Sequence, residues 1–190
     1  PQEDYFDADL WETFVLSESL QSGIKQTWNN VNVLDINEDG FADILAGGED
    51  GMFGWFESPA DVYDLDLWRF HPISDSHWVM GIHVADMDHD GDIDLVVSEK
   101  GQHEHAGVWW FENNPDSRES LWERHLIVSR KELRMIDIAD VDMDGYIDVV
   151  AAGSSPEEII ISLRLNDEGT AWDTIIIPAE YGGELKGIVV

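Results

Sequence analysis

The sequence predicts an all-β fold, a β-propeller of four-stranded antiparallel blades, and three observations support it. An acidic pattern, Asp-x-Asp-x-Asp-Gly-x-x-Asp with one substitution, starts at Asp35, Asp86 and Asp140, at intervals of about 50 residues. The segment Trp-Phe-Glu at 55–57 returns at 110–112. A tryptophan near the start of a short apolar segment keeps the same interval, at Trp11, Trp68, Trp122 and Trp172. A repeat of this length is typical of a propeller blade.

Each repeat is expected to contain four short strands. An apolar or alternating run leads into the acidic loop, and a second apolar run follows it. An aromatic segment comes third, and the segment with the recurring tryptophan comes last. Few helices are expected, because no stretch of 11 or more residues has a 3.6-residue period.

The chain is expected to form a single partial propeller domain over residues 1–190, with about three and a half blades. Propellers close with about four to eight blades, and an open arc leaves unpaired sheet edges. We therefore expect either a longer chain that supplies the remaining blades, in a ring of seven, or a second copy that closes the ring. The expected segments are blades at about 31–73, 82–128 and 136–177, an outer strand of a preceding blade at 11–16, and the start of a following blade at 187–190.

Composition excludes several classes of function. The chain has 41 Asp and Glu against 10 Lys and Arg, a formal charge of −31, so a nucleic-acid partner is not expected. The absence of cysteine excludes disulfides, thiolate zinc sites and cysteine nucleophiles. No apolar run approaches the ~18 residues that cross a bilayer, so membrane insertion is not expected. The acidic excess suggests bound divalent cations.

The spacing of the acidic loops suits a hard cation. Oxygens at loop positions 1, 3 and 5 converge, glycine at position 6 permits a sharp turn, and the aspartate at position 9 closes the cage. Position 7 would offer a backbone carbonyl, from Phe41, Asp92 and Tyr146. An all-oxygen, anionic ligand set favours Ca²⁺ over Mg²⁺. A solvated acidic turn without metal is the alternative, and three copies in register argue against it.

The loops lack the Glu at position 12 of an EF-hand, and strands are expected to flank them. From the segment at 11–16 to Val190 the sequence resembles the FG-GAP or VCBS type of calcium-binding repeat, found in the β-propellers of integrin alpha chains and in many bacterial extracellular proteins. The resemblance implies a seven-bladed propeller, with each loop joining the innermost strand to the second, and secretion or surface display. Carried over by position, it implies three structural Ca²⁺ sites: Asp35, Asn37, Asp39 and Asp43; Asp86, Asp88, Asp90 and Asp94; and Asp140, Asp142, Asp144 and Asp148. Asn37 would weaken the first site.

Since calcium would be structural, the function is expected on the face opposite the acidic loops. Aromatic rings stack on sugars, and Arg and Lys pair with carboxylate or sulfate groups. We therefore expect an extracellular binding or adhesion module that recognises carbohydrate or a protein partner. The candidate ligand-binding residues are Trp28, Trp78, Lys100, Arg130, Lys131, Arg134 and Lys186.

Three alternatives remain open. A polysaccharide lyase acting on uronate-containing glycans would need a base beside a cation, and the candidates are His77, His103, His105 and Tyr181. The His-x-His pair at 103–105 would also suit a transition metal. A purely structural or assembly role is the third. No sequence motif supports enzyme chemistry.

Overall fold

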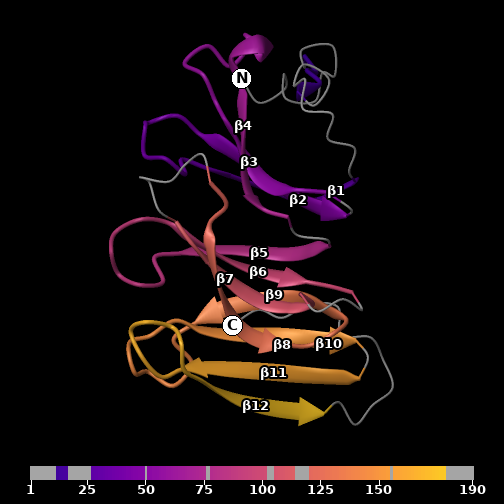
Figure 1. Ribbon diagram of the computed structural model, residues 1–190, viewed down its shortest axis with the longest axis vertical. Coiled ribbons are helices and arrows are strands. Elements are labelled where there is room, and N and C mark those ends of the chain that lie inside the picture. The colour runs from indigo at the N-terminus through magenta and orange to yellow at the C-terminus, as the bar shows by residue number, and fades with distance from the viewer. Residues whose placement is uncertain are drawn as a thin grey trace, which may run out of the picture.

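Three four-stranded antiparallel β-sheets follow one another along the long axis of the molecule (Figure 1). The computed structural model describes residues 12–16, 27–49, 51–75, 78–101, 105–113, 120–154 and 156–178. In each sheet every strand pairs with the next along the chain, and none of the three sheets is closed. The predicted all-β fold of four-stranded antiparallel blades is confirmed.

The strands are short and share one order in every sheet. Sheet one contains β1 (Thr27–Leu34), β2 (Asp43–Glu49), β3 (Phe53–Glu57) and β4 (Arg69–Ser74), with a 3-10 helix, η3 (Leu65–Leu67), before β4. Sheet two contains β5 (Val79–Ala85), β6 (Asp94–Glu99), β7 (Gly107–Glu112) and β8 (Glu123–Ser129). Sheet three contains β9 (Leu133–Ala139), β10 (Asp148–Ser154), β11 (Glu157–Arg164) and β12 (Trp172–Pro178).

Two apolar seams join the sheets. Between sheets one and two, Leu45 and Phe53 pack with Phe111, whose ring centre lies 5.7 Å from that of Phe53. Between sheets two and three, Trp110 and Ile160 belong to a second cluster. Both seams are formed by fully buried side chains, each contributing about 1.5–3 kcal/mol to stability. The second strand of each sheet is therefore covered on both faces, as its continuous apolar run predicts.

The recurring Trp-Phe-Glu segment contributes a buried aromatic and a polar partner for the fourth strand. Trp55 lies opposite His71 in the register of β3 and β4, and their rings stack with centres 4.5 Å apart. His71 Nε2 lies 2.8 Å from Glu57 Oε2. Sheet two repeats the arrangement with Trp110, His125 and Glu112.

The N-terminal strand expected at 11–16 is not observed over residues 12–15, which have no strand structure. Phe14 instead packs edge-on against Tyr63, with ring centres 5.5 Å apart. The Phe14 and Val15 side chains stay 44% and 50% exposed. The segment expected at 187–190 lies outside the described residues. None of the helices in the described residues has the length and apolar character needed to span a bilayer.

Candidate metal centre

The three acidic loops connect the first strand of each sheet to the second and share one backbone conformation. At position 6 a glycine takes a positive φ, which other residues adopt only at a cost. At position 4 a non-glycine residue also enters the left-handed region, which is uncommon. These φ values are 92°, 101° and 98° at Gly40, Gly91 and Gly145, and 56°, 63° and 65° at Glu38, His89 and Met143.

Position 9 of each loop ties the loop to the third strand of its sheet. Asp94 is buried, its Oδ2 accepts the Met87 N–H at 3.0 Å, and its Oδ1 accepts the Asn113 N–H at 2.8 Å. The same pair of bonds reaches Asp43 from Ile36 and Ser58, and Asp148 from Val141 and Arg164. This anchoring role adds to the predicted role as a ligand, and the spacing alone does not reveal it.

Backbone N–H groups also shape the rest of the loop. In the second loop Asp86 Oδ2 accepts the Gly91 N–H at 3.1 Å, and Asp90 Oδ1 accepts the Asp92 N–H at 2.9 Å. Equivalent bonds form in the first and third loops. The backbone of the loop therefore curves around its own aspartate side chains. Their negative charges are concentrated on the inner side of the loop.

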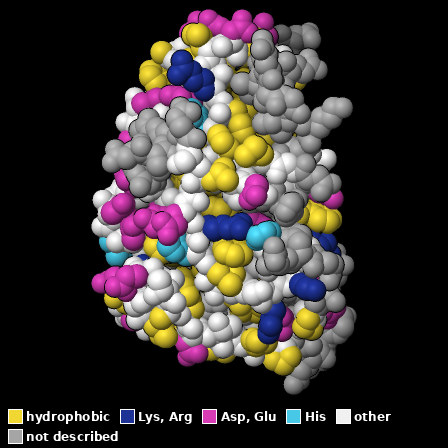
Figure 2. Space-filling view, viewed as in Figure 1, with side chains coloured by type: hydrophobic (Ala, Val, Ile, Leu, Met, Phe, Trp, Pro, Cys, Tyr) yellow, Lys and Arg dark blue, Asp and Glu magenta, His cyan; other side chains and the backbone are white. Residues whose placement is uncertain are grey.

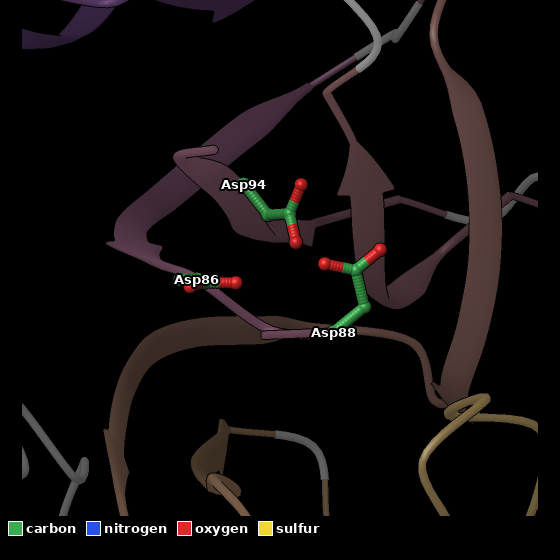
Figure 3. A group of neighbouring side chains, drawn as sticks. All are labelled: Asp86, Asp88 and Asp94. Atoms are coloured by element: carbon green, nitrogen blue, oxygen red, sulfur yellow. The ribbon is translucent and has the colours of Figure 1, made fainter. Parts of the chain in front are cut away.

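Positions 1, 3 and 9 converge in the second and third loops. Carboxylate oxygens of Asp86, Asp88 and Asp94 lie within 4.8 Å of one another, and Figure 3 shows the Asp88 and Asp94 carboxylates directed toward each other. Asp86 Oδ1 is buried and has no hydrogen-bond partner within the described residues. A buried carboxylate oxygen without a donor is what a hard cation would satisfy. The third loop has the same grouping in Asp140, Asp142 and Asp148.

Crowding and burial disfavour the ionised carboxylates in the absence of a cation. Burial raises the pKa of Asp94 to about 7, although the hydrogen bonds from Asn113 and Met87 lower it. Burial also raises the pKa of Asp88, and the neighbouring Asp90 charge adds to that effect. The pKa of Asp43 is raised by burial as well. A divalent cation would remove both penalties.

The first loop differs from the other two. Among the described residues the carboxylates of Asp35, Asp39 and Asp43 do not form such a group. The Asn37 side-chain amide donates to Asp39 Oδ2 at 3.1 Å, and this hydrogen bond offsets part of the negative charge of the loop. The position 5 aspartates of the other loops, Asp90 and Asp144, also lie outside the two groups.

Several candidate residues for the opposite face have partners of their own. Lys100 Nζ lies 3.3 Å from Glu132 Oε2 and 4.9 Å from the centre of the Trp78 ring. Arg130 Nε lies 3.1 Å from Glu158 Oε1. These cations are thus largely neutralised by neighbouring acids.

The remaining described candidates are dispersed. The Arg134 guanidinium donates to Ser154 Oγ at 3.3 Å, and Lys131 is exposed. Trp28 packs edge-on against Phe56 of β3, with ring centres 5.7 Å apart. His105 Nδ1 lies 3.1 Å from Arg124 Nη2. His77, His103, Tyr181 and Lys186 lie outside the described residues.

Arg164, at the end of β11, is a site residue that the sequence analysis missed. It is 0% exposed, and its guanidinium donates to the carbonyl oxygens of Met87 and Asp167. It also lies over the rings of Trp110 and Tyr146, at 5.3 and 5.4 Å. It is the structural counterpart of Ser58 and Asn113, because each of the three donates its backbone N–H to the position 9 aspartate of its sheet.

One comparison with known proteins gave a match. Residues 35–97 match the family model of the FG-GAP-like repeat, and this range contains the first two acidic loops and strands β2 to β5. A search of curated proteins found no match. The predicted FG-GAP-type repeat is thereby confirmed for residues 35–97.

Proposed function

Because residues 35–97 form an FG-GAP-like repeat, we propose that the chain is a calcium-stabilised, propeller-like binding module that acts outside the cell. The acidic loops would hold Ca²⁺ as a structural ion. The observation that carries this proposal is the group of Asp86, Asp88 and Asp94, in which one buried oxygen lacks a donor.

The donor set suits calcium. All the side-chain atoms that could bind a metal in the two groups are carboxylate oxygens, which are ligands for hard cations. Bound Ca²⁺ would neutralise the crowded carboxylates and hold the loop against the strands on either side of it. Figure 2 shows acidic side chains gathered along the left edge, where the loops before β2 and β6 lie in Figure 1. Ion binding at this edge would reduce the repulsion among them.

Calorimetry with and without calcium tests the proposal. A ligand that binds only the folded state at a hundredfold excess over Kd contributes about 2.7 kcal/mol, which corresponds to a Tm higher by about 5–10 °C in a protein of this size. Asp88→Asn should remove much of this increase. Glu168→Gln, an equal change of charge at an exposed position, should leave it intact. Equal melting in calcium and in chelator would contradict the proposal.

Recognition of carbohydrate or a protein partner belongs to the same proposal, on the face opposite the acidic loops. Trp78 supports it, since an aromatic ring in contact with Lys100 is a suitable platform for a sugar. A glycan array probed with the calcium-loaded protein is the test, with Trp78→Ala as the variant expected to lose binding. Release of unsaturated product from uronate polymers would instead support the lyase alternative.

A further inference from the structure

A cavity of about 330 Å³ lies at the seam between sheets one and two, beside the first two acidic loops. This volume is at the lower end of the ~300–1,000 Å³ range of small-molecule sites. Its lining includes the buried Trp55 and Asn113, the exposed Glu38 and the half-buried Asp92. The lining residues are Ile36, Asn37, Glu38, Trp55, Asp92, Ile93, Asn113 and Trp122.

At the seam between sheets two and three, the side chain of Arg164 occupies the position that corresponds to this cavity. Asn113 and Arg164 occupy equivalent positions, because each donates its backbone N–H to the position 9 aspartate of its sheet. Their side chains also reach equivalent acceptors in the preceding sheet. The Asn113 amide lies 3.5 Å from the Ile36 carbonyl oxygen, whereas the Arg164 guanidinium donates to the Met87 carbonyl oxygen. The longer arginine side chain thus extends into the space that asparagine leaves open.

The contacts of Arg164 define what this place accepts. Its guanidinium lies 5.3 Å from the Trp110 ring and donates to two further carbonyl oxygens, those of Asn166 and Asp167. Burial lowers the pKa of the Arg164 guanidinium, and the nearby charges of Asp167, Asp88 and Asp94 oppose that shift. A planar cation is therefore held by an aromatic ring, backbone carbonyls and nearby acids.

The open cavity keeps the aromatic ring and one of the backbone carbonyls, and acids at different positions line it. Trp55 replaces Trp110, and the Ile36 carbonyl replaces that of Met87. Asp92 stands where the other seam has Tyr146, and Glu38 adds a second acid. Neither carboxylate has an ion-pair partner within the described residues, and no Lys, Arg or His is among the residues that line the cavity.

We propose that the cavity between sheets one and two binds a guanidinium group supplied from outside the chain, either by a small guanidine compound or by an arginine side chain of a protein partner. The ligand would occupy the position that Arg164 fills at the other seam. Asp92 belongs to the second acidic loop, but none of the grouped carboxylates of the second and third loops lines the cavity.

Titration calorimetry in saturating calcium tests the proposal with two matched probes. Nα-acetyl-arginine amide should bind with about millimolar Kd, as expected for a ligand of this size. Nα-acetyl-citrulline amide has nearly the same shape without the charge, and it should bind at least about tenfold more weakly. Equal affinity for the two probes, or no binding of the arginine probe, would overturn the proposal.

Variants locate the site. Asn113→Arg should fill the cavity as Arg164 does, abolish binding of the arginine probe and leave the Tm equal or higher. Glu38→Gln combined with Asp92→Asn changes only loop side chains and should weaken binding at least about tenfold. Glu168→Gln should have no effect. Unchanged affinity in the double variant would show that the probe binds elsewhere and would overturn the assignment, even if Asn113→Arg failed to fold.

A third arm distinguishes the two sources of the group. Agmatine is the small-molecule probe, and a short peptide with one central arginine is the protein-like probe. Tighter binding of the peptide than of agmatine would assign the site to an arginine side chain of a partner, and the reverse order would assign it to a small guanidine. Failure of both to compete with the arginine amide would contradict the proposal.

Discussion

The position 9 aspartates have two tasks at the scale of single residues. Each accepts two backbone N–H groups, from the loop and from the end of the third strand, and in the second and third loops each also belongs to the metal group. The backbone bonds use one lone pair on each oxygen, which leaves further lone pairs for an ion. Replacement of this residue should therefore affect the sheet as well as calcium binding.

The calcium-free protein should lose stability as the pH rises. Because burial raises the pKa of Asp94 to about 7, the native state keeps a proton that the unfolded chain releases near pH 4. The stabilising contribution is complete below about pH 4 and is lost between about pH 4 and 7. In chelator we expect a lower Tm at about pH 7.5 than at about pH 5, and calcium should reduce the difference.

Asp94→Asn isolates this effect, because the amide does not titrate. The slope of Tm against pH in chelator should be shallower in this variant, whatever its absolute Tm. A chelated wild-type protein that gains stability from about pH 5 to 7.5 would contradict the argument.

Arg164→Ala should be among the most destabilising substitutions. It removes a buried cation that holds two sheets together and leaves the Met87 carbonyl without its donor. A loss of about 3–5 kcal/mol is expected for such a buried charged group, measured by urea unfolding. Arg69→Ala, at an exposed position of β4, is the matched control and should change stability by less than about 0.5 kcal/mol. Similar losses in the two variants would contradict the assigned role.

Among single residues, the recurring aspartates could be predicted from the sequence, whereas Arg164 could not. The aspartates could be identified because their spacing recurs. Arg164 differs from its counterparts in the other repeats, so periodicity hid it. Its burial depends on contact with Met87 and Trp110 in another sheet, and such long-range contacts leave no local pattern.

At the scale of elements, the acidic loop is a fixed turn with two unusual backbone positions. Gly145 has a φ of 98°, and no atom lies within 4 Å of the place where a Cβ would stand. The glycine is therefore required by backbone conformation rather than by lack of space. Met143 adopts a φ of 65° although it is not glycine, and its side chain is 89% exposed.

These two positions should respond in opposite directions. Gly145→Ala should destabilise the protein by about 1–2 kcal/mol, and Met143→Gly should stabilise it by up to about 1 kcal/mol, because glycine adopts positive φ at little cost. Chemical denaturation in saturating calcium measures both. Shifts of the same sign would show that the loop conformation differs from the one described.

Most strands could be predicted because apolar runs and turn residues mark them. The strand expected at 11–16 could not be judged in this way, because an apolar segment forms a strand only where a neighbouring edge is available to pair with it. Phe14 and Val15 instead line a pocket together with Trp28 and Val31 of sheet one. The sequence shows that the segment is apolar, but it does not show which strand, if any, pairs with it.

At the scale of the whole molecule, the row of three sheets has apolar side chains exposed at each end. On β1 of sheet one, Val31 and Val33 are 59% and 68% exposed. On β12 of sheet three, Ile175 and Ile177 are 45% and 47% exposed. Ile175 occupies the register position of His125, which packs on Trp110 near the seam with sheet three. The face on sheet three thus corresponds to one that is covered in the preceding sheet.

We propose that a second copy of the chain covers these faces, with sheet three of one copy packing on sheet one of the other; further blades supplied by a longer chain are the alternative. Continuity with the two existing seams supports this arrangement, which is the assembly role considered from the sequence. Light scattering should give a mass above that of one chain, increasing with concentration. Ile175→Lys combined with Ile177→Lys should restore the monomer mass, and a wild-type protein that is monomeric at all concentrations would contradict the proposal.

The two unlike ends of this row of sheets have a consequence for contacts between copies of the chain. Because the β1 side of sheet one and the β12 side of sheet three differ, copies could join only head to tail, without a twofold axis relating them. Each added copy would then expose a new surface to which the next copy can bind. Growth would stop only if the rotations between successive copies add up to a full turn, so that the last copy contacts the first. The angle between neighbouring sheets would thus decide between a finite circle and an endless fibre.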